Sequence, residues 1–277
     1  MPPLIPVDQL AGPTFGSIGI AGAPKTGKTY SLRTLRLYLL KHNLCPRIAL
    51  FDLDDDGADT LIAVAKEEGW MTPEFLEVYR YNEKGRPIKQ GQDSDRSAIP
   101  TETFISDAAK LYDRLDPKTG TWLPGQELGA VVVDSMTALN ERWVEFIGAV
   151  GHKTTGDFTW TEWRRTRDKI LETVKSFKGL PCYSVFMFHE VLIQEEVAGP
   201  DPKQPAKTTG NMLWVPKIQG DLNTTIQKEF SVFVHSKVEG GNQYKWITQP
   251  TDRIRAIGSR NKKSMPKEVA QDFENIL

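Results

Sequence analysis

An α/β fold, with helices on both faces of a mostly parallel twisted sheet, is the class that this 277-residue sequence predicts. Two observations lead to it. Short runs of consecutive apolar and β-branched residues alternate with longer segments that have helical spacing. The apolar runs are continuous, as in strands that are buried on both faces. Strands that alternate with helices in this way are typical of parallel sheets.

Five apolar runs are expected to form the strands of the sheet. They occupy residues 17–22, 47–54, 76–81, 128–135 and 182–190. Helical spacing is clearest after the first strand, where Leu32, Leu35 and Leu39 recur on one face. The expected helices span residues 28–43, 106–115, 136–150 and 159–178.

The pattern changes after residue 190. Short β runs at 191–197 and 230–247 follow, with a hairpin turn expected at Gly240 and Gly241. Segments 83–100 and 198–212 have the composition of mobile loops. We therefore expect one domain over residues 1–277, with a core at about 14–238 and a β-hairpin and basic tail at 239–277.

The composition is that of a globular protein, with 39% hydrophobic and 26% charged residues. The net charge of −1 means that a nucleic-acid surface would have to be a local basic patch. The sequence shows neither a signal peptide nor about 18 consecutive apolar residues, so we expect a cytoplasmic protein that does not enter a membrane. Cys45 and Cys182 lie in or beside apolar runs and are expected to be reduced.

The stretch GIAGAPKTGKTY, residues 19–30, contains the pattern G-x-x-x-x-G-K-T, called Walker A. Its glycines let backbone N–H groups turn toward phosphates, its lysine reaches the β- and γ-phosphates and its hydroxyl holds Mg²⁺. The expected strand before it and helix after it place a helix N-terminus against the anion. The alternative is a glycine-rich turn with a solvated lysine. The candidate nucleotide-binding residues are Gly22, Ala23, Pro24, Lys25, Thr26, Gly27, Lys28, Thr29 and Tyr30.

A second motif, AVVVDSMTAL, places Asp134 at the end of a buried strand. A carboxylate at such a position is costly to desolvate unless a cation or hydrogen bonds compensate it. Asp134 is therefore a candidate Mg²⁺ ligand together with Thr29. The alternative is that Asp134 caps the following helix, a role that Ser135 could also take.

Hydrolysis of a nucleotide also needs a group that polarises the attacking water. The run FDLDDDG offers four carboxylates, of which Asp54 is the best candidate base, while Asp55 and Asp56 fit a solvated loop. His189, at the end of VFMFHE, is a candidate sensor of the γ-phosphate or an ordinary histidine at a strand end.

In their order along the chain, the four motifs resemble those of RecA-like P-loop ATPases: residues 22–29, 52–54, 131–139 and 185–190. The phrase DFTWTEWRRTRDKI, the dipeptide HE and the basic tail look more like the phage nucleotide-binding (AAA-type) proteins, a group that includes small RecA-like single-strand annealing ATPases. The resemblance implies ATP and Mg²⁺ as cofactors and, for a phage protein, the host cytoplasm as its location. Lys28 and Thr29 would contact phosphate and Mg²⁺, and Asp134 would lie in the Mg²⁺ shell.

At two positions the sequence departs from the pattern of these families. Asp54 falls where such ATPases usually have a catalytic glutamate, and His189 falls where RecA-like recombinases more often have glutamine. The first change affects the expected rate of hydrolysis more than the expected binding of nucleotide. The catalytic residues implied are Lys28, Asp54, Asp134 and His189.

The resemblance also implies that the loops after the fourth and fifth strands, approximately 148–160 and 191–213, face single-stranded DNA. Basic side chains there can neutralise phosphates, and Trp160 can stack on bases. Core packing for the tryptophan and plain solubility for the lysines are the alternatives. The candidate DNA-binding residues are His152, Lys153, Trp160, Lys203 and Lys207.

Self-association into a ring or filament is a further implication, because a basic residue of the next subunit often completes the ATP site in such assemblies. The candidates for this contact are Arg253, Arg255 and Arg260. A phage single-strand binding protein is a possible additional partner.

Three functions are compatible with these motifs. The leading one is an ATPase that binds single-stranded DNA and promotes annealing or strand exchange. The second is a nucleotide-dependent switch or scaffold that acts on a protein partner, which the near-neutral charge and the aspartate at position 54 favour. The third, a small-molecule kinase, would need an acceptor site and an arginine-rich lid, and the sequence shows neither.

Overall fold

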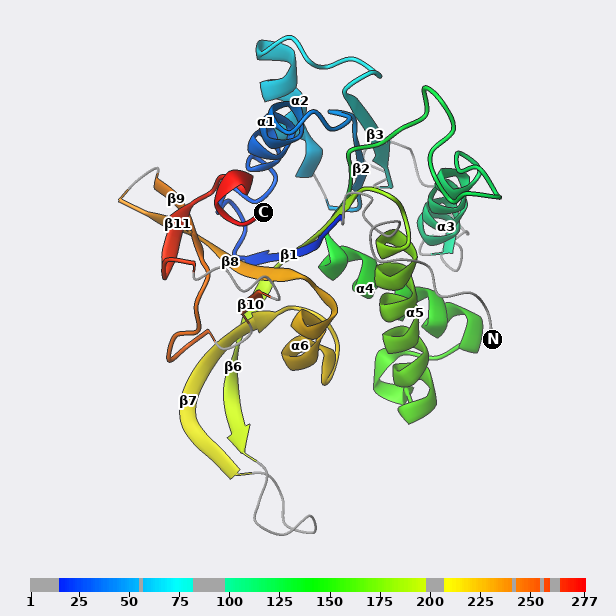
Figure 1. Ribbon diagram of the computed structural model, residues 1–277. Coiled ribbons are helices and arrows are strands. Elements are labelled where there is room, and N and C mark those ends of the chain that lie inside the picture. The colour runs from blue at the N-terminus through cyan, green and yellow to red at the C-terminus, as the bar shows by residue number, and fades with distance from the viewer. Residues whose placement is uncertain are drawn as a thin grey trace, which may run out of the picture.

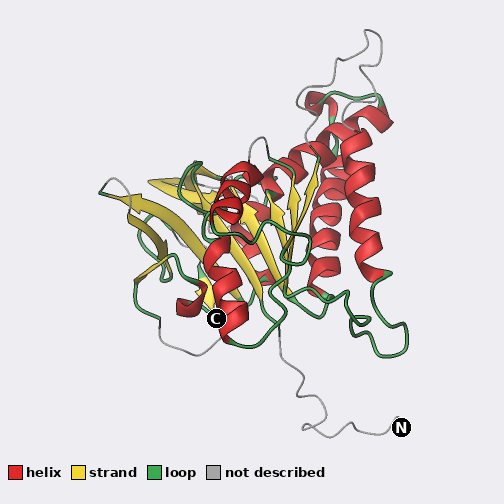
Figure 2. Ribbon diagram, turned by 90° about the horizontal axis from the view of Figure 1, so that it is seen from above, coloured by secondary structure: helices red, strands yellow, loops and turns green. Residues whose placement is uncertain are grey.

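The computed structural model describes residues 15–54, 57–81, 98–197, 207–240, 243–254, 257–259 and 265–277. Within these residues the main sheet has nine strands in the order β11-β9-β8-β1-β5-β4-β2-β3, with β10 paired to β8 (Figure 1). Helices lie on both faces of this sheet (Figure 2).

Six neighbouring strands of the sheet are parallel, from β3 through to β8. They are β1 (Ser17–Gly22), β2 (Ile48–Asp52), β3 (Leu76–Arg80), β4 (Ala130–Asp134), β5 (Tyr183–Phe188) and β8 (Val232–Glu239). β5 lies between β1, which enters the glycine-rich loop, and β4, which ends at Asp134. The mostly parallel sheet with helices on both faces confirms the predicted α/β fold class.

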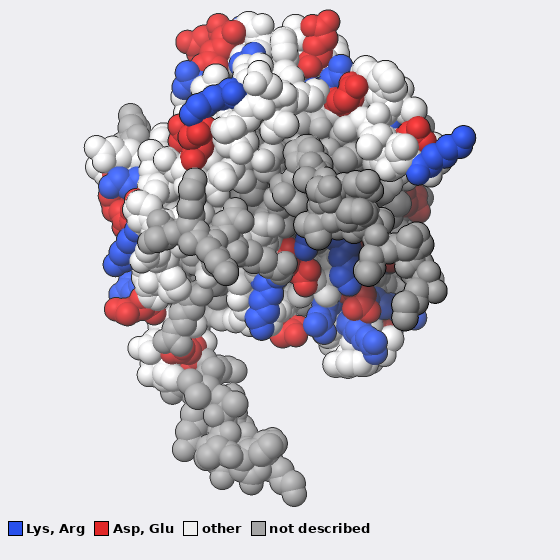
Figure 3. Space-filling view, viewed as in Figure 1, with Lys and Arg blue, Asp and Glu red and all other residues white. Residues whose placement is uncertain are grey.

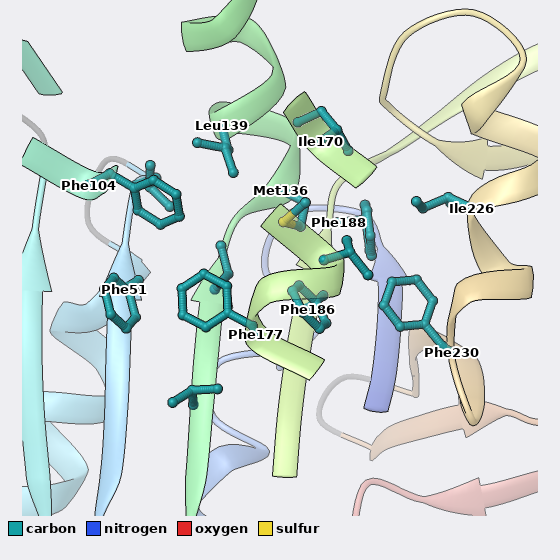
Figure 4. Packing of buried hydrophobic residues seen from close by; sticks show 14 of the residues in the cluster. Phe51, Phe104, Met136, Leu139, Ile170, Phe177, Phe186, Phe188, Ile226 and Phe230 are labelled. Atoms are coloured by element: carbon teal, nitrogen blue, oxygen red, sulfur yellow. The ribbon is translucent and has the colours of Figure 1, made fainter. Parts of the chain in front are cut away.

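Successive residues of a strand point to opposite sides of the sheet. Helices cover both sides, so both faces are buried. On one side, Phe51, Phe186 and Phe188 pack against α3 (Ala98–Tyr112), α4 (Met136–Gly151), α5 (Trp160–Lys178) and α6 (Leu222–Thr225) (Figure 4). On the other side, Leu50 and Val132 pack against α1 (Leu32–Lys41), α2 (Gly57–Glu67) and the 3₁₀ helix η4 (Phe273–Asn275). The two layers fix the strands whose ends carry the candidate site.

The bounds of the five predicted strands, and of the helices at 136–150 and 159–178, agree with the structure to within two residues. The first helix, expected from residue 28, begins instead at Leu32. Residues 28–31 form tighter turns, in which the Ser31 hydroxyl donates to the carbonyl of Lys28 at 2.5 Å. Local side-chain bonds of this kind compete with regular helix formation.

Two further helices differ from the expectation. α3 begins at Ala98 and not at residue 106, with Pro100 in its first turn, where a helix tolerates proline. As a result, residues 98–100, expected to be a mobile loop, are helical. α2 was not predicted. The 3₁₀ helices η2 (Thr155–Asp157) and η3 (Ile226–Glu229) are single turns.

A two-stranded antiparallel sheet, β6 (Glu190–Val197) with β7 (Lys207–Pro216), projects from the body of the molecule as an arm (Figure 1). Residues 207–212 therefore form a strand, and the expectation of a loop there was wrong. Their composition is that of a loop, but pairing with β6 supplies partners for the backbone. Residues 198–206 and 83–97 lie outside the described residues.

The C-terminal part continues the main sheet with antiparallel strands, as the predicted hairpin extension requires. β9 (Gln243–Ile247) pairs with β8, and β11 (Glu268–Ala270) pairs with β9. β10 (Gly258–Ser259) is short. Gly240, at the end of β8, has a φ of 53°, as expected for a glycine turn.

The expectation of reduced cysteines is met. Cys45 and Cys182 are both free thiols. Among the helices that the structure describes, none is long and apolar enough to cross a membrane.

Candidate nucleotide-binding site

The carboxyl ends of β1, β2, β4 and β5 meet at one edge of the sheet, where parallel α/β sheets commonly bind ligands. A cavity of about 570 Å³ opens there, a size that accommodates a small-molecule ligand. Its walls come from the glycine-rich loop, the ends of three strands, α2 and the C-terminal hairpin. The lining residues are Pro24, Lys25, Gly27, Lys28, Thr29, Tyr30, Asp54, Thr60, Asp134, His189 and Tyr244.

The glycine-rich loop owes its course to two residues with positive φ, Lys25 at 64° and Gly27 at 83°. A side chain at Gly27 would be strained by this φ, and its Cβ would lie 2.6 Å from Cδ1 of Tyr244. Left-handed residues between right-handed ones turn successive N–H groups to one side, which creates an anion-binding concavity. Gly27 is therefore required both by the turn and by the approach of Tyr244.

Lys28, the residue before Thr29 in the loop, is buried, with 6% of its surface exposed. Its Nζ donates to the carbonyl oxygens of Gly22 and Ala23, at 2.9 Å each. Burial lowers the pKa of this ammonium group, and the carboxylates of Asp134, Glu190 and Asp54 oppose that effect. The structure thus excludes the alternative of a solvated lysine.

Thr29 and Asp134 are in direct contact, because the Thr29 hydroxyl donates to Oδ2 of Asp134 at 2.6 Å. Asp134 is buried, and burial raises its carboxyl pKa, while the hydrogen bond from Thr29 and the charge of Lys28 lower it. Asp134 does not cap α4. Ser135 does, since its Oγ accepts the N–H of Ala138 at 3.2 Å.

The hydroxyl of Thr29 and the carboxylate of Asp134 fit a Mg²⁺ ion. Magnesium in such sites takes one or two protein oxygens and completes its shell with waters and substrate phosphates. A cation would also compensate the buried Asp134 charge. Among the described residues, no group of three or more His, Cys, Asp or Glu side chains could hold a metal alone.

The candidate base and the candidate sensor are also in contact. Nε2 of His189 forms a hydrogen bond with Oδ2 of Asp54, and both side chains line the cavity. Backbone bonds hold each of them: Asp54 N–H donates to the Asp134 carbonyl at 3.2 Å, and His189 N–H donates to Oγ1 of Thr137 at 3.0 Å. Sequence did not predict that Asp54 and His189 would form a pair.

Asp52 is fully buried and is not part of a solvated acidic loop. It pairs in register with Asp134 of the neighbouring strand β4. Burial, and then the charge of Asp134, raise the pKa of Asp52 to about 7, against hydrogen bonding from the Ala58 N–H and the charge of Arg80. Asp55 and Asp56 lie outside the described residues.

Four residues near the loop were not among the predicted site residues. Tyr244 packs against Tyr30, with ring centroids 6.2 Å apart, and both rings line the cavity. Gln271 donates to the carbonyl of Thr26 at 2.9 Å, and Glu190 accepts the N–H of Ala23 at 3.1 Å and contacts His235. Three of them lie at least 200 positions after the loop, where no local pattern links them to it. Only Glu190 was marked in the sequence, because it is the second residue of the dipeptide HE.

The candidate DNA-binding residues lie in different environments. His152 is exposed at the C-terminus of α4, and Trp160 is 72% exposed at the start of α5. Lys153 donates to Oε1 of Glu162 at 2.9 Å, and Glu162 in turn caps α5. The ammonium group of Lys153 is thus already used within the protein. Lys207 is the first residue of β7, and Lys203 lies outside the described residues.

Trp160 belongs to a second cavity, of about 510 Å³, between α5 and residues 219–221. The guanidinium of Arg164 lies 5.2 Å from the centre of the Trp160 ring. Arg167 is 3.7 Å from Oδ2 of Asp221. Trp163 lines the same cavity and packs edge-on against Phe158.

Among the arginines considered for contact with a neighbouring subunit, the structure describes Arg253. Its side chain is exposed and its carbonyl oxygen accepts the N–H of Trp214 at 2.8 Å. Arg255 and Arg260 lie outside the described residues. On the face shown in Figure 3, acidic and basic side chains are interspersed over the part of the surface that is described.

Comparisons with known proteins give little beyond the fold. No protein-family model matches the chain, and no curated protein matches it. Among solved structures, the chain is similar to the crystal structure of the KaiC-like protein PH0186 from the hyperthermophilic archaeon Pyrococcus horikoshii OT3. The identity is 9%, the TM-score is 0.38, and the match covers 84% of this chain and 77% of that one. A similarity of this size assigns no function.

Proposed function

We propose that the protein is a Mg²⁺-dependent ATPase that binds single-stranded DNA and promotes annealing or strand exchange. The observation that carries the nucleotide part is the convergence of Lys28 and the Thr29–Asp134 pair on one cavity of about 570 Å³. A buried ammonium group, a row of turned backbone amides and a hydroxyl beside a carboxylate are the groups that bind a triphosphate and its metal ion.

Each residue of the loop has one role in this proposal. Lys28 neutralises the β- and γ-phosphates from its place against the carbonyls of Gly22 and Ala23. Thr29 and Asp134 hold the ion. Bound Mg²⁺ supplies positive charge that stabilises the negative charge developing on the transferred phosphoryl oxygens.

Asp54 and His189 act on the attacking water. The Asp54 carboxylate accepts a hydrogen bond or a proton from it, and His189 fixes the orientation of that carboxylate through Nε2. Because His189 directly follows β5, its side chain can also respond to the γ-phosphate. Catalysis then depends on how these two side chains rearrange around the nucleotide.

The aromatic rings of Tyr30 and Tyr244 provide a site for the base. Both line the cavity, and Tyr244 closes it from the C-terminal hairpin. Stacking on an aromatic ring contributes about 1–3 kcal/mol per base and is tolerant of base identity. We propose ATP as the nucleotide because the motifs resemble those of ATPases. The two rings by themselves do not distinguish one nucleobase from another.

The DNA part of the proposal is supported by Trp160 and Arg164. An exposed indole beside a guanidinium suits stacking on bases and contact with phosphates in single strands. Association of the chain with itself, with Arg253, Arg255 or Arg260 completing a neighbour's site, belongs to the same proposal, as does a phage single-strand binding protein as partner.

The second candidate function is a nucleotide-dependent switch that acts on a protein partner. The interspersed charges of Figure 3 and the internal ion pair of Lys153 with Glu162 favour it. A DNA-binding protein gains affinity by neutralising phosphates, and a surface of mixed charge offers less of that gain.

One experiment separates these functions. ATP hydrolysis is measured with and without single-stranded DNA at low and moderate salt, for the wild type and Lys28→Ala, with gel filtration of each state. Stimulation by DNA that is lost in Lys28→Ala supports the first function. Nucleotide binding without any effect of DNA at low salt supports the second. A wild type that binds no nucleotide contradicts both.

A further inference from the structure

Glu190 reaches across the end of β1 and contacts two other segments. It is the first residue of β6, next to His189. Its Oε1 accepts the N–H of Ala23, the residue that opens the loop, at 3.1 Å. Its Oε2 lies 2.9 Å from Nδ1 of His235 on β8. One carboxylate thus joins β6, the loop and β8, with side-chain exposure of 11% for Glu190 and 1% for His235.

The register of the sheet explains why this bridge forms. β1 lies between β5 and β8, and Ala21 pairs with Phe188 on one side and with His235 on the other. Glu190 is two residues beyond Phe188, and Ala23 is two residues beyond Ala21. The three residues are therefore brought to the same edge by three neighbouring strands.

Ala23 is the point at which this bridge meets the phosphate site. Its N–H is held by Glu190, while its carbonyl oxygen accepts hydrogen bonds from Nζ of Lys28 at 2.9 Å and from Oγ1 of Thr26 at 2.8 Å. The N–H and the C=O of Ala23 are therefore both held by hydrogen bonds. The position of the Lys28 ammonium group depends on the orientation of Ala23.

The hydrogen bonds also determine which nitrogen of His235 carries the proton. Nε2 is buried, and among the described residues it has no hydrogen-bond partner. A buried N–H without an acceptor is costly, so the proton resides on Nδ1, which donates to Glu190. His235 therefore orients Glu190 so that its other oxygen faces the loop.

We propose that Glu190 and His235 are positioning residues that hold the opening of the glycine-rich loop in its phosphate-binding shape. The inference rests on the proposed binding of a nucleoside triphosphate to this loop. Neither residue contacts the nucleotide in this role. Glu190 fixes the Ala23 peptide, His235 fixes Glu190, and the peptide fixes Lys28.

The test compares substitutions that keep or remove the donor at position 235. Asn places its Nδ2 close to the position of the histidine Nδ1, so His235→Asn keeps a donor for Glu190, whereas His235→Leu removes it. Glu190→Ala removes the bridge. Val238→Ala, on an exposed side chain of the same strand, is the matched control. The dissociation constant for ATP with Mg²⁺, the KM and kcat of hydrolysis, and the thermal unfolding of the nucleotide-free protein are measured for each.

We expect Glu190→Ala and His235→Leu to raise the dissociation constant and the KM for ATP about tenfold, with kcat at saturating ATP within about threefold of the wild type. His235→Asn is expected to stay within about threefold in all three values. ATP affinity equal to that of the wild type in folded Glu190→Ala and His235→Leu overturns the inference and leaves a purely structural bridge. A wild type that binds no ATP overturns the proposed function and this inference with it.

Discussion

Thr29 and Asp134, which are 105 positions apart in the chain, are joined by a hydrogen bond of 2.6 Å at the edge of the sheet. One residue ends the glycine-rich loop and the other ends β4, with β5 between β1 and β4. The pair would hold the metal ion of a bound nucleotide, and this role gives the first prediction.

Thr29→Val is expected to remove the part of ATP affinity that depends on Mg²⁺ and to lower the hydrolysis rate at least about 100-fold, since the side chain keeps its shape but loses the oxygen. Binding of ATP is measured by calorimetry with Mg²⁺ and with EDTA. Thr173→Val, on α5, is the control. An unchanged dependence on Mg²⁺ in Thr29→Val would show that this hydroxyl is not a ligand.

Asp54→Asn is expected to separate hydrolysis from binding. The asparagine keeps the shape of the side chain but cannot accept a proton, so kcat should fall about 100-fold or more while the dissociation constant for ATP changes less than about threefold. His189→Gln, which keeps a hydrogen-bond donor near Asp54, should reduce kcat less. Equal loss of binding and kcat in Asp54→Asn would place Asp54 in nucleotide binding.

Tyr244→Ala removes the ring that packs against Tyr30 in the wall of the cavity. Because one stacked ring contributes about 1–3 kcal/mol, the affinity for ATP and ADP should fall by about 5- to 150-fold. Tyr244→Phe should bind as the wild type does, since stacking does not need the hydroxyl. Inorganic triphosphate, which has no base, should bind the wild type and Tyr244→Ala equally, and a matching loss for triphosphate would argue against base stacking.

Asp52→Asn tests the buried carboxyl beside Asp134. Its pKa is raised to about 7 in the folded protein, from an ordinary value of 3.8. Between these two values the folded state holds a proton that the unfolded state has lost, so this group lowers stability as pH rises from about 4 to about 7. An asparagine at this position does not titrate, so it does not lower stability as the pH rises.

The substitution should therefore stabilise the protein by up to about 4 kcal/mol at pH 8 and have little effect at pH 4, since the pKa is raised by about three units and each unit corresponds to about 1.4 kcal/mol. Urea unfolding at both values checks this. Asp59→Asn, on an exposed partner of the same Arg80, is the control. A stabilisation of equal size at both pH values would contradict the raised pKa.

Trp160→Ala is expected to weaken binding of single-stranded DNA about tenfold or more while leaving ATP affinity unchanged, since the exposed ring lies far from the glycine-rich loop in sequence and lines a separate cavity. Fluorescence anisotropy of a labelled oligonucleotide measures it at two salt concentrations. Lys153→Ala should change DNA affinity less than Trp160→Ala, because its ammonium group is bound to Glu162. The reverse order would restore Lys153 as the DNA contact.

The part of the site that could be predicted from sequence is the part built from local patterns. The glycine spacing around Lys28 and the apolar run before Asp134 each describe one strand and the turn after it, so the motif and the strand were located within two residues. Ser135, and not Asp134, proved to be the helix cap, because both residue types satisfy the same composition rule and the geometry selects one of them.

The rest of the site depends on contacts between distant segments. Three residues of the C-terminal part lie near the loop because β8, β9 and residue 271 pack on the β1 side of the sheet: Tyr244, His235 and Gln271. No periodicity in the sequence predicts that packing. The strand at 207–212 was missed for the same reason, since it exists through its pairing with β6. Sequence patterns predict which secondary structure a segment can form, whereas its contacts with distant segments are seen only in the folded structure.

Gln271 has a consequence for the order in which the protein acquires its parts. Its amide bonds to the carbonyl of Thr26, 245 positions earlier, and to Ser236 and Lys245. During synthesis, this support for the glycine-rich loop is made only more than 240 residues after the loop itself. Contacts of such sequence separation form late and slowly. A nascent chain should therefore gain full affinity for nucleotide only after residue 271 has been made and packed, so ATP would stabilise the completed site and not guide the early steps of folding.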